Sequence, residues 1–381
     1  MSTILITYER TNATTEINIE SYKELLSALN NEVRVKKTQS VTAEDLGWCD
    51  ICLAIRPNSI YSVAIAKAAV SAERYYISSF DDDIVNLPKP NPEAWKRKYA
   101  IMCIKKSNAV FSTSPFILKD YRKYSNDYNS VWTDAFVRSC DIKKTHNVGE
   151  KIRIIYPAGV DHIGLYNKYI KPIVNELFDM YPDKLDFTFV GVKPNVNDFK
   201  YPQSVHLVDA MPFSDYQKYM MINDFDIGIA PLCKTNFNER KYFIKFIEYA
   251  KYSIAGLYSD VFPYKTVVFD KHNGVLVNNS ANDWKQALIM LIEDGAILRN
   301  IVDNSQKYLQ QNLLFEIVCK KLKEQCQELG SFKSPKPNNH ISIVLSKFYV
   351  IIYILHDILA RTIYHLRKDG IKYVFQYIKK R

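Results

Sequence analysis

The chain lacks an N-terminal apolar segment and any long hydrophobic run. Its first residues, MSTILITYER, contain no basic segment followed by a run of roughly 7–15 apolar residues, so we expect no secretion signal and a cytoplasmic protein. The longest unbroken apolar stretch, Phe348–Leu355, has eight residues, far fewer than the about 20 that span a bilayer. We therefore expect no transmembrane helix.

Cysteines are few and do not pair. The seven cysteines, at positions 49, 52, 103, 140, 233, 319 and 326, form an odd and scattered set, unlike a disulfide framework. Cys49 and Cys52 have the C-x-x-C spacing, but no second cysteine or histidine pair follows at a zinc-site distance, and Trp48–Ile55 is typical of a buried strand. We expect reduced thiols and no metal or redox chemistry.

The positive charge is concentrated at one end. The net charge is +10, and the segment Ser331–Arg381 holds ten basic and two acidic residues, or +8 of it. The charge of the remaining residues is nearly balanced, which argues against nucleic-acid binding by the main part of the chain. This distribution favours a basic terminal segment that meets an anionic surface.

The length of 381 residues predicts two domains. In the first half, short apolar runs alternate with helical patterns, which is typical of an α/β domain with a mainly parallel sheet. Strands are expected at 3–8, 50–55, 75–80, 109–112 and 130–136, and helices at 19–29, 62–74, 93–106 and 115–124.

The same alternation begins again after a polar linker at 140–150. Strands are expected at 152–156, 187–190, 204–207, 226–230, 254–258 and 275–277, and helices at 166–180, 214–222, 240–250 and 283–294. We therefore predict Rossmann-like domains at 1–145 and 151–330, followed by a tail at 331–381. Ligands of such sheets bind beyond the carboxyl ends of the strands.

The most informative segment is Asp226–Tyr264. A strand ends in Ala230-Pro231-Leu232, a polar loop reaches Asn238, and the predicted helix carries Lys241, Lys245 and Glu248 at spacings i, i+4 and i+7. That spacing places all three on one helical face, directed toward the strand ends. The alternative is a solvated helix surface.

This segment resembles the donor-binding signature of family-4-type glycosyltransferases (glycosyl transferases group 1). The pattern is roughly D-I-G-x-A-P-L, a loop with F-N, then K-x-x-x-K-x-x-E-Y and x-S-D-V-x-P-Y. The matching positions are Asp226, Pro231, Leu232, Phe237, Asn238, Lys241, Lys245, Glu248, Tyr249, Ser259, Asp260, Pro263 and Tyr264. The resemblance implies a GT-B fold, in which two doubly wound α/β domains face a cleft, and transfer of a sugar from a nucleotide-diphosphate sugar with retention and without a metal.

The resemblance also assigns roles. Glu248 takes the place of the glutamate that holds the ribose, and Lys241 that of the lysine facing the diphosphate, with Lys245 as a second candidate. The expected donor pocket also includes Gly159, His162, Gly191, Pro231, Asn238, Tyr249, Asp260 and Tyr264. The glutamate that usually contacts the sugar has no counterpart, so a catalytically silent scaffold and a nucleotide-sugar epimerase remain alternatives.

In the first half, Asp81, Asp82 and Asp83 directly follow a strand. Three adjacent carboxylates suit a metal site or a capped turn. The resemblance favours a third interpretation, in which they line the acceptor side of the cleft. Arg56 and the loop Glu9–Glu16 are further acceptor-side candidates.

The tail between Ile341 and Leu366 has an apolar helical face opposite a polar one, and cations follow it. This pattern is typical of a helix lying in a membrane interface. The alternative is that the apolar face packs on the protein body or on a second copy. Membrane attachment would suit a lipid-linked glycan acceptor in cell-surface polysaccharide biosynthesis, with the enzyme peripheral on the inner face of the plasma membrane.

Overall fold

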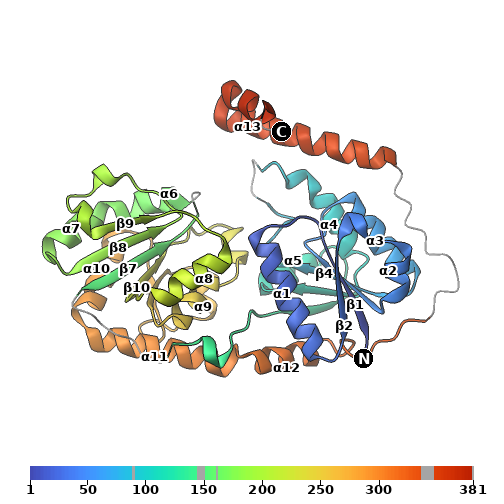
Figure 1. Ribbon diagram of the computed structural model, residues 1–381, viewed down its shortest axis with the longest axis horizontal. Helices are drawn as coiled ribbons and strands as arrows, with labels where there is room; N and C mark the ends of the chain where they lie inside the picture. The colour runs from blue at the N-terminus through green and yellow to red at the C-terminus, as the bar shows by residue number, and fades with distance from the viewer. Residues whose placement is uncertain (88–90, 144–150, 160–161, 336–346, 380–381) are drawn as a thin grey trace. The chain divides into compact units, whose positions relative to one another are not determined.

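The computed structural model describes residues 1–87, 91–143, 151–159, 162–335 and 347–379, and the chain forms two compact units (Figure 1). Unit 1 comprises Met1–Ala135 and Val318–Arg381, and unit 2 comprises Phe136–Ile317. This division differs from the predicted one. The chain leaves unit 1 before residue 145, and residues 318–330 belong to unit 1 rather than to the second domain.

Unit 1 is built on a six-stranded parallel sheet with the strand order β2-β1-β3-β4-β5-β6. Its strands are β1 (Thr3–Tyr8), β2 (Glu32–Lys37), β3 (Ile51–Ile55), β4 (Tyr75–Phe80), β5 (Ala109–Ser112) and β6 (Asn129–Trp132). Its helices are α1 (Ala13–Ala28), α2 (Ala43–Trp48), α3 (Ile60–Ser71), α4 (Arg97–Ile104), α5 (Pro115–Tyr121) and α13 (Lys347–Lys379).

The composition of the strands explains their places in this sheet. Every residue of β3 (ICLAI) and β4 is buried, as expected of central parallel strands covered on both faces. The edge strand β2 (EVRVKK) is charged and half-exposed, a composition that keeps a sheet edge from pairing with another chain. Because β2 lacks an apolar run, the sequence pattern did not predict it. Cys49 and Cys52 are buried free thiols.

The other edge of this sheet is covered by the returning chain. Helix α12 (Phe315–Gln325) ends beside β6, where the Gln325 side chain accepts a hydrogen bond from the Trp132 N–H (2.8 Å) and donates one to the Trp132 carbonyl (3.0 Å). The amide thus pairs with the edge strand as another strand would. This contact explains why the residues after 317 belong to unit 1.

Unit 2 has a second six-stranded parallel sheet, with the order β12-β11-β10-β7-β8-β9. Its strands are β7 (Ile152–Pro157), β8 (Leu185–Val190), β9 (Val205–Val208), β10 (Ile227–Ala230), β11 (Ala255–Ser259) and β12 (Val275–Val277). Its helices are α6 (Ile163–Leu165), the π-helical turn η5 (Tyr166–Ile170), α7 (Lys171–Met180), α8 (Phe213–Ile222), α9 (Ile244–Lys251), α10 (Ala281–Glu293) and α11 (Gly295–Asn312).

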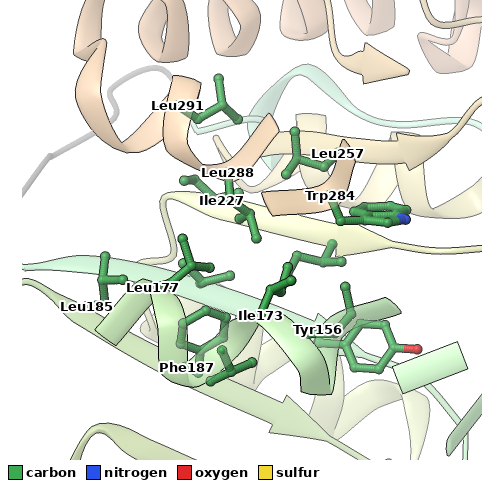
Figure 2. Close-up of a cluster of buried hydrophobic side chains, with 14 of the residues drawn as sticks. Tyr156, Ile173, Leu177, Leu185, Phe187, Ile227, Leu257, Trp284, Leu288 and Leu291 are labelled. Atoms are coloured by element: carbon green, nitrogen blue, oxygen red, sulfur yellow. The ribbon is translucent and has the colours of Figure 1, made fainter. Parts of the chain in front are cut away.

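One apolar cluster holds unit 2 together (Figure 2). Trp284 and Leu288 of α10 and Leu177 of α7 pack in one cluster with Phe187 of β8 and Leu257 of β11, and all five side chains are buried. Burying such side chains contributes about 1.5–3 kcal/mol each. The cluster fixes the strands in register, so the loops at their carboxyl ends start from a rigid base.

The tail forms the long helix α13, interrupted at Gly370, where φ is +75°. None of the helices in the described part of the chain combines the length and apolarity that crossing a bilayer requires.

Candidate functional site

In unit 2, the predicted donor residues gather where parallel strands end. Gly191 follows β8 and has a φ of +79°, and a Cβ there would lie 2.6 Å from the carbonyl oxygen of Ala158, just after β7. Only glycine fits this backbone. The Ala158 N–H also donates to the Val190 carbonyl (2.9 Å), so the ends of β7 and β8 are held side by side.

Gly159 and His162 stand at the start of the helix after β7. The His162 N–H donates to the Gly159 carbonyl (3.0 Å), and its own carbonyl accepts from the hydroxyl of the buried Tyr156 (3.5 Å). Gly159 is exposed, as required of a backbone that a phosphate could approach. Their predicted contact with the donor remains a prediction.

The loop after β10 is tied to β11 by a small polar network. Ser259 is buried, and its hydroxyl accepts from the Leu232 N–H (2.7 Å) and donates to the Asn279 side chain (2.6 Å). Asn279 in turn donates to the Leu232 carbonyl (2.9 Å). The network fixes the buried Pro231 at the carboxyl edge of the sheet. The sequence pattern pointed to Ser259 and missed Asn279.

Helix α9 begins at Ile244, which corrects the predicted helix at 240–250. Lys241 has an extended backbone before the helix, so it does not share a helical face with the other two residues. Lys245 and Glu248 do come together: Lys245 Nζ lies 2.6 Å from Glu248 Oε2. The physical reason is the turn at 238–240, which uses the residues that were expected to start the helix.

Glu248 is largely shielded from solvent between α9 and α8. The Tyr216 hydroxyl of α8 donates to Glu248 Oε2 (3.4 Å), and the Lys245 ammonium lies over the Tyr216 ring at 5.3 Å. Burial raises the pKa of Tyr216, and the nearby Glu248 carboxylate raises it further, so Tyr216 stays a neutral donor. The hydrogen bond from Tyr216 and the ion pair with Lys245 both use Oε2 of Glu248. Tyr216 was not among the predicted site residues, because no motif marks it.

Lys241 and Asn238 belong to the loop between β10 and α9. The Asn238 side chain donates to the Cys233 carbonyl (3.0 Å), which closes the loop on itself. The Lys241 ammonium lies 5.6 Å from the centroid of the Phe237 ring. Asn238 is therefore a residue that shapes the loop carrying Lys241.

Two predicted donor residues lie in the core. The Tyr249 hydroxyl donates to the Ile229 carbonyl (2.9 Å) under β10, and Tyr264 is buried against the Tyr258 ring at 4.9 Å. This differs from the predicted direct donor contact, since both side chains support the sheet from within. Asp260 is half-exposed after β11 and pairs with Lys265 (2.9 Å).

In unit 1, two of the three consecutive aspartates meet Arg56. Arg56 follows β3 with a φ of +48°, and its guanidinium donates to both oxygens of Asp81 and to Asp82 (2.7 Å). Asp83 turns the other way: it is buried and accepts from the Tyr121 hydroxyl (3.1 Å) and the Asn86 side chain. The aspartates therefore do not converge on one point. Asp83 is a turn residue, which corrects its predicted acceptor-side place.

Glu9 directly follows β1 and lies at the same carboxyl edge of the sheet. The Ser62 hydroxyl and the Asn58 N–H, at the start of α3, both donate to its carboxylate. Burial raises the pKa of Glu9, and the hydrogen bonds from the Ser59 and Ser62 hydroxyls and from Asn58 only partly oppose it. Among the described residues, no group of three or more His, Cys, Asp or Glu side chains is arranged to hold a metal ion.

Comparison with known proteins gives structural likeness only. No protein-family model matches the chain, and no curated protein sequence does. Among solved structures, 86% of the chain matches all of Anabaena HepE in complex with UDP, with a TM-score of 0.59 and 12% identity. A glycosyltransferase from Rickettsia africae matches 87% of this chain and 99% of its own, with a TM-score of 0.61 and 14% identity.

A third similar structure belongs to another class of enzyme. A putative UDP-N-acetylglucosamine 2-epimerase from Listeria monocytogenes matches 89% of this chain and 99% of its own, with a TM-score of 0.54 and 11% identity. Together with the two parallel sheets, these likenesses show that the chain has the GT-B fold of glycosyltransferases.

Proposed function

We propose that the protein is a nucleotide-sugar-dependent glycosyltransferase that transfers a sugar from a nucleotide diphosphate to a hydroxyl of a glycan acceptor. The observation that carries this proposal is the set of residues at the carboxyl edge of unit 2. A glycine-only strand end at Gly191, a cation at Lys241 and a shielded carboxylate at Glu248 occur on the fold that HepE uses to bind UDP. Each part suits one group of such a donor.

The ribose diol needs an acceptor of hydrogen bonds. Lys245 and Tyr216 hold Glu248 by Oε2. We assign the other oxygen, Oε1, to accept hydrogen bonds from the ribose hydroxyls. A carboxylate makes stronger hydrogen bonds to hydroxyls than a neutral group does. Glu248 is thus pre-positioned before the donor arrives.

The diphosphate needs positive charge and backbone N–H groups. Lys241 supplies the charge, and the backbone after Gly159 and Gly191 allows close approach. These groups would stabilise the leaving diphosphate without a metal ion, and the anomeric configuration would be retained. Lys241 and Glu248 are therefore the residues that we assign to the reacting donor.

The acceptor hydroxyl would come from unit 1. Arg56 with Asp81 and Asp82 forms a charged, hydrogen-bonding group at the carboxyl edge of that sheet, which suits a polyhydroxylated glycan. The basic tail favours an acceptor on a lipid carrier, and hence a peripheral enzyme at the inner face of the membrane in cell-surface polysaccharide assembly.

A product assay tests this proposal. The full chain is incubated with a panel of radiolabelled nucleotide sugars and a lipid-extract acceptor, and products are separated into lipid-linked, free and nucleotide-linked sugar. Transfer into the lipid phase supports the proposal. A converted sugar with no acceptor added would point to the epimerase, for which the Listeria structure is the specific reason. Donor binding without any turnover would point to a silent scaffold.

A further inference from the structure

The charged face of α13, and not its apolar face, is attached to unit 1. Asp357 is buried there and contacts three cations: Lys96 at 3.2 Å, Arg10 at 3.2 Å and Arg361 at 3.2 Å. Glu93 contacts the same three side chains. Two acids and three bases thus form one closed network, here called the clamp.

The clamp joins sequence-distant parts of unit 1. Arg10 follows β1, while Glu93 and Lys96 lie in the connection from β4 to α4. Both connections leave the carboxyl ends of parallel strands, which is the edge that also carries Arg56, Asp81 and Asp82. The clamp therefore places α13 at the predicted acceptor edge of unit 1.

The buried members of the clamp depend on one another for charge compensation. Lys96 is 1% exposed, so its ammonium depends on Glu93 and Asp357 for compensation. Burial acts to raise the pKa of Asp357, but the charges of Lys96, Arg361 and Arg10 outweigh it and hold that pKa below its ordinary value. The Trp95 and His356 rings add an aromatic contact beside the clamp, with centroids 5.5 Å apart.

Away from Asp357, α13 carries large apolar side chains that the described residues leave substantially exposed. Seven large side chains repeat at helical spacing and are 40–58% exposed: Ile351, Ile354, Leu355, Ile358, Leu359, Ile363 and Leu366. At 100° per residue, Leu355 and Leu359 lie about 160° from Asp357. A helix on a globular protein normally buries its apolar stripe. Here the stripe, called the apolar strip below, faces outward.

The charges beyond this strip indicate what covers it. After Leu366 the sequence contains six basic residues and one acid, together with Tyr373, Phe375 and Tyr377. Cations meet anionic headgroups, and aromatic side chains favour the membrane–water interface. A second copy of this chain would bring the same positive charge and repel it.

We propose that the clamp holds α13 on unit 1 so that its apolar strip enters the interface of an anionic lipid bilayer, with the acceptor edge of unit 1 toward the membrane. This inference rests on the proposed function for the acceptor it would serve, and it names the surface and orientation by which a lipid-linked acceptor is met. The helix lies in the interface and does not cross the bilayer.

The test uses the full chain with vesicles of phosphatidylcholine, with and without about one-third phosphatidylglycerol. Leu355→Gln together with Leu359→Gln should lower binding to the anionic vesicles by at least about tenfold, since each leucine loses apolar burial. The matched control is Ile222→Gln, an exposed apolar residue of α8 in unit 2, which should bind as the wild type does. Circular dichroism and UDP affinity confirm that each variant is folded.

A second variant separates the clamp from the strip. Asp357→Lys leaves the apolar strip intact but puts four cations around Glu93, so α13 should leave unit 1. Amide hydrogen exchange at 351–366 should then rise in solution, while binding to anionic vesicles persists. The Leu355→Gln/Leu359→Gln variant should show the reverse, with unchanged exchange and lost binding.

Three results would overturn the inference: equal vesicle binding by the strip variant and the wild type, equal binding to neutral and anionic vesicles, or a wild-type dimer that the strip variant converts to a monomer. The last result would assign the strip to a second copy. If the Leu355→Gln/Leu359→Gln variant loses vesicle binding but still transfers sugar to a water-soluble acceptor, the inference is supported and the proposed function stands. Vesicle binding without transfer from any nucleotide sugar would overturn the proposed function alone.

Discussion

Replacing Gly191 by alanine tests whether the ends of β7 and β8 form the rigid base of a donor site. The φ of +79° costs an L-residue about 1–2 kcal/mol. The new Cβ would also lie 2.6 Å from the Ala158 carbonyl oxygen, a backbone atom that moves only with its strand, and such overpacking adds about 1–3 kcal/mol. We therefore expect Gly191→Ala to lower the free energy of unfolding of unit 2 by about 2–5 kcal/mol.

The assay is urea-induced unfolding followed by the fluorescence of Trp284. This is the one tryptophan between residues 136 and 317, and it lies in the core of unit 2. Replacing the other three tryptophans by phenylalanine isolates its signal. The matched control is Gly164→Ala. Among the described residues, no atom outside its own helix and chain neighbours lies within 4 Å of the new Cβ, and alanine favours a helical position over glycine by up to about 1 kcal/mol. Gly191→Ala should also weaken UDP binding. Equal stability of the two variants, with unchanged UDP affinity, would refute the reasoning.

Three further predictions concern charge. Lys241→Ala should weaken UDP binding more than uridine binding in calorimetric titration, with the exposed Lys218→Ala as control; equal losses for both ligands would remove Lys241 from the diphosphate. Transfer activity should persist in excess EDTA, and loss of turnover that manganese restores would require a metal site. Burial acts to raise the pKa of Asp50, but hydrogen bonds from the Thr3 and Ser334 N–H groups and from Lys333 outweigh it and lower that pKa to about 2. At pH values above the pKa of Asp50 in the unfolded chain, the ionised carboxylate should therefore stabilise the fold by about 2 kcal/mol. Asp50→Asn should therefore lower the thermal midpoint at pH 7 and have little effect below pH 2; an equal deficit at both pH values would contradict this.

The sequence predicted the strands that contain a short apolar run. The strands β1, β4, β5 and β12 have the predicted bounds, because their apolar runs end at polar loops. The charged edge strand β2 was missed, since half-exposed edge positions accept Glu, Arg and Lys. Helices α11 and α12 were also missed, and the path of α12 back to unit 1 depends on a long-range contact between Gln325 and Trp132 that no local pattern encodes.

The donor site itself stays a prediction, but the structure shows how its predicted members lie. The motif placed Lys245 and Glu248 together, as the structure shows. It could not show that a turn would displace Lys241 from the helix, or that Tyr249 would donate to the Ile229 carbonyl in the core. In the tail, the helical pattern predicted the two faces of α13. Which face attaches to the body depends on Glu93 and Lys96, which lie more than 250 residues earlier.

The central claim is that unit 2 binds a nucleotide sugar with Glu248 on the ribose. The most direct measurement is calorimetric titration of the wild type and the Glu248→Gln variant with UDP and with 2′,3′-dideoxy-UDP. A charge-assisted hydrogen bond contributes about 1.5–3 kcal/mol, so the wild type should prefer UDP by roughly 10- to 150-fold. The variant should bind both ligands with the weaker affinity. If the wild type does not bind UDP, or if the variant keeps the full preference for it, Glu248 does not hold the ribose and the account of the donor site is wrong.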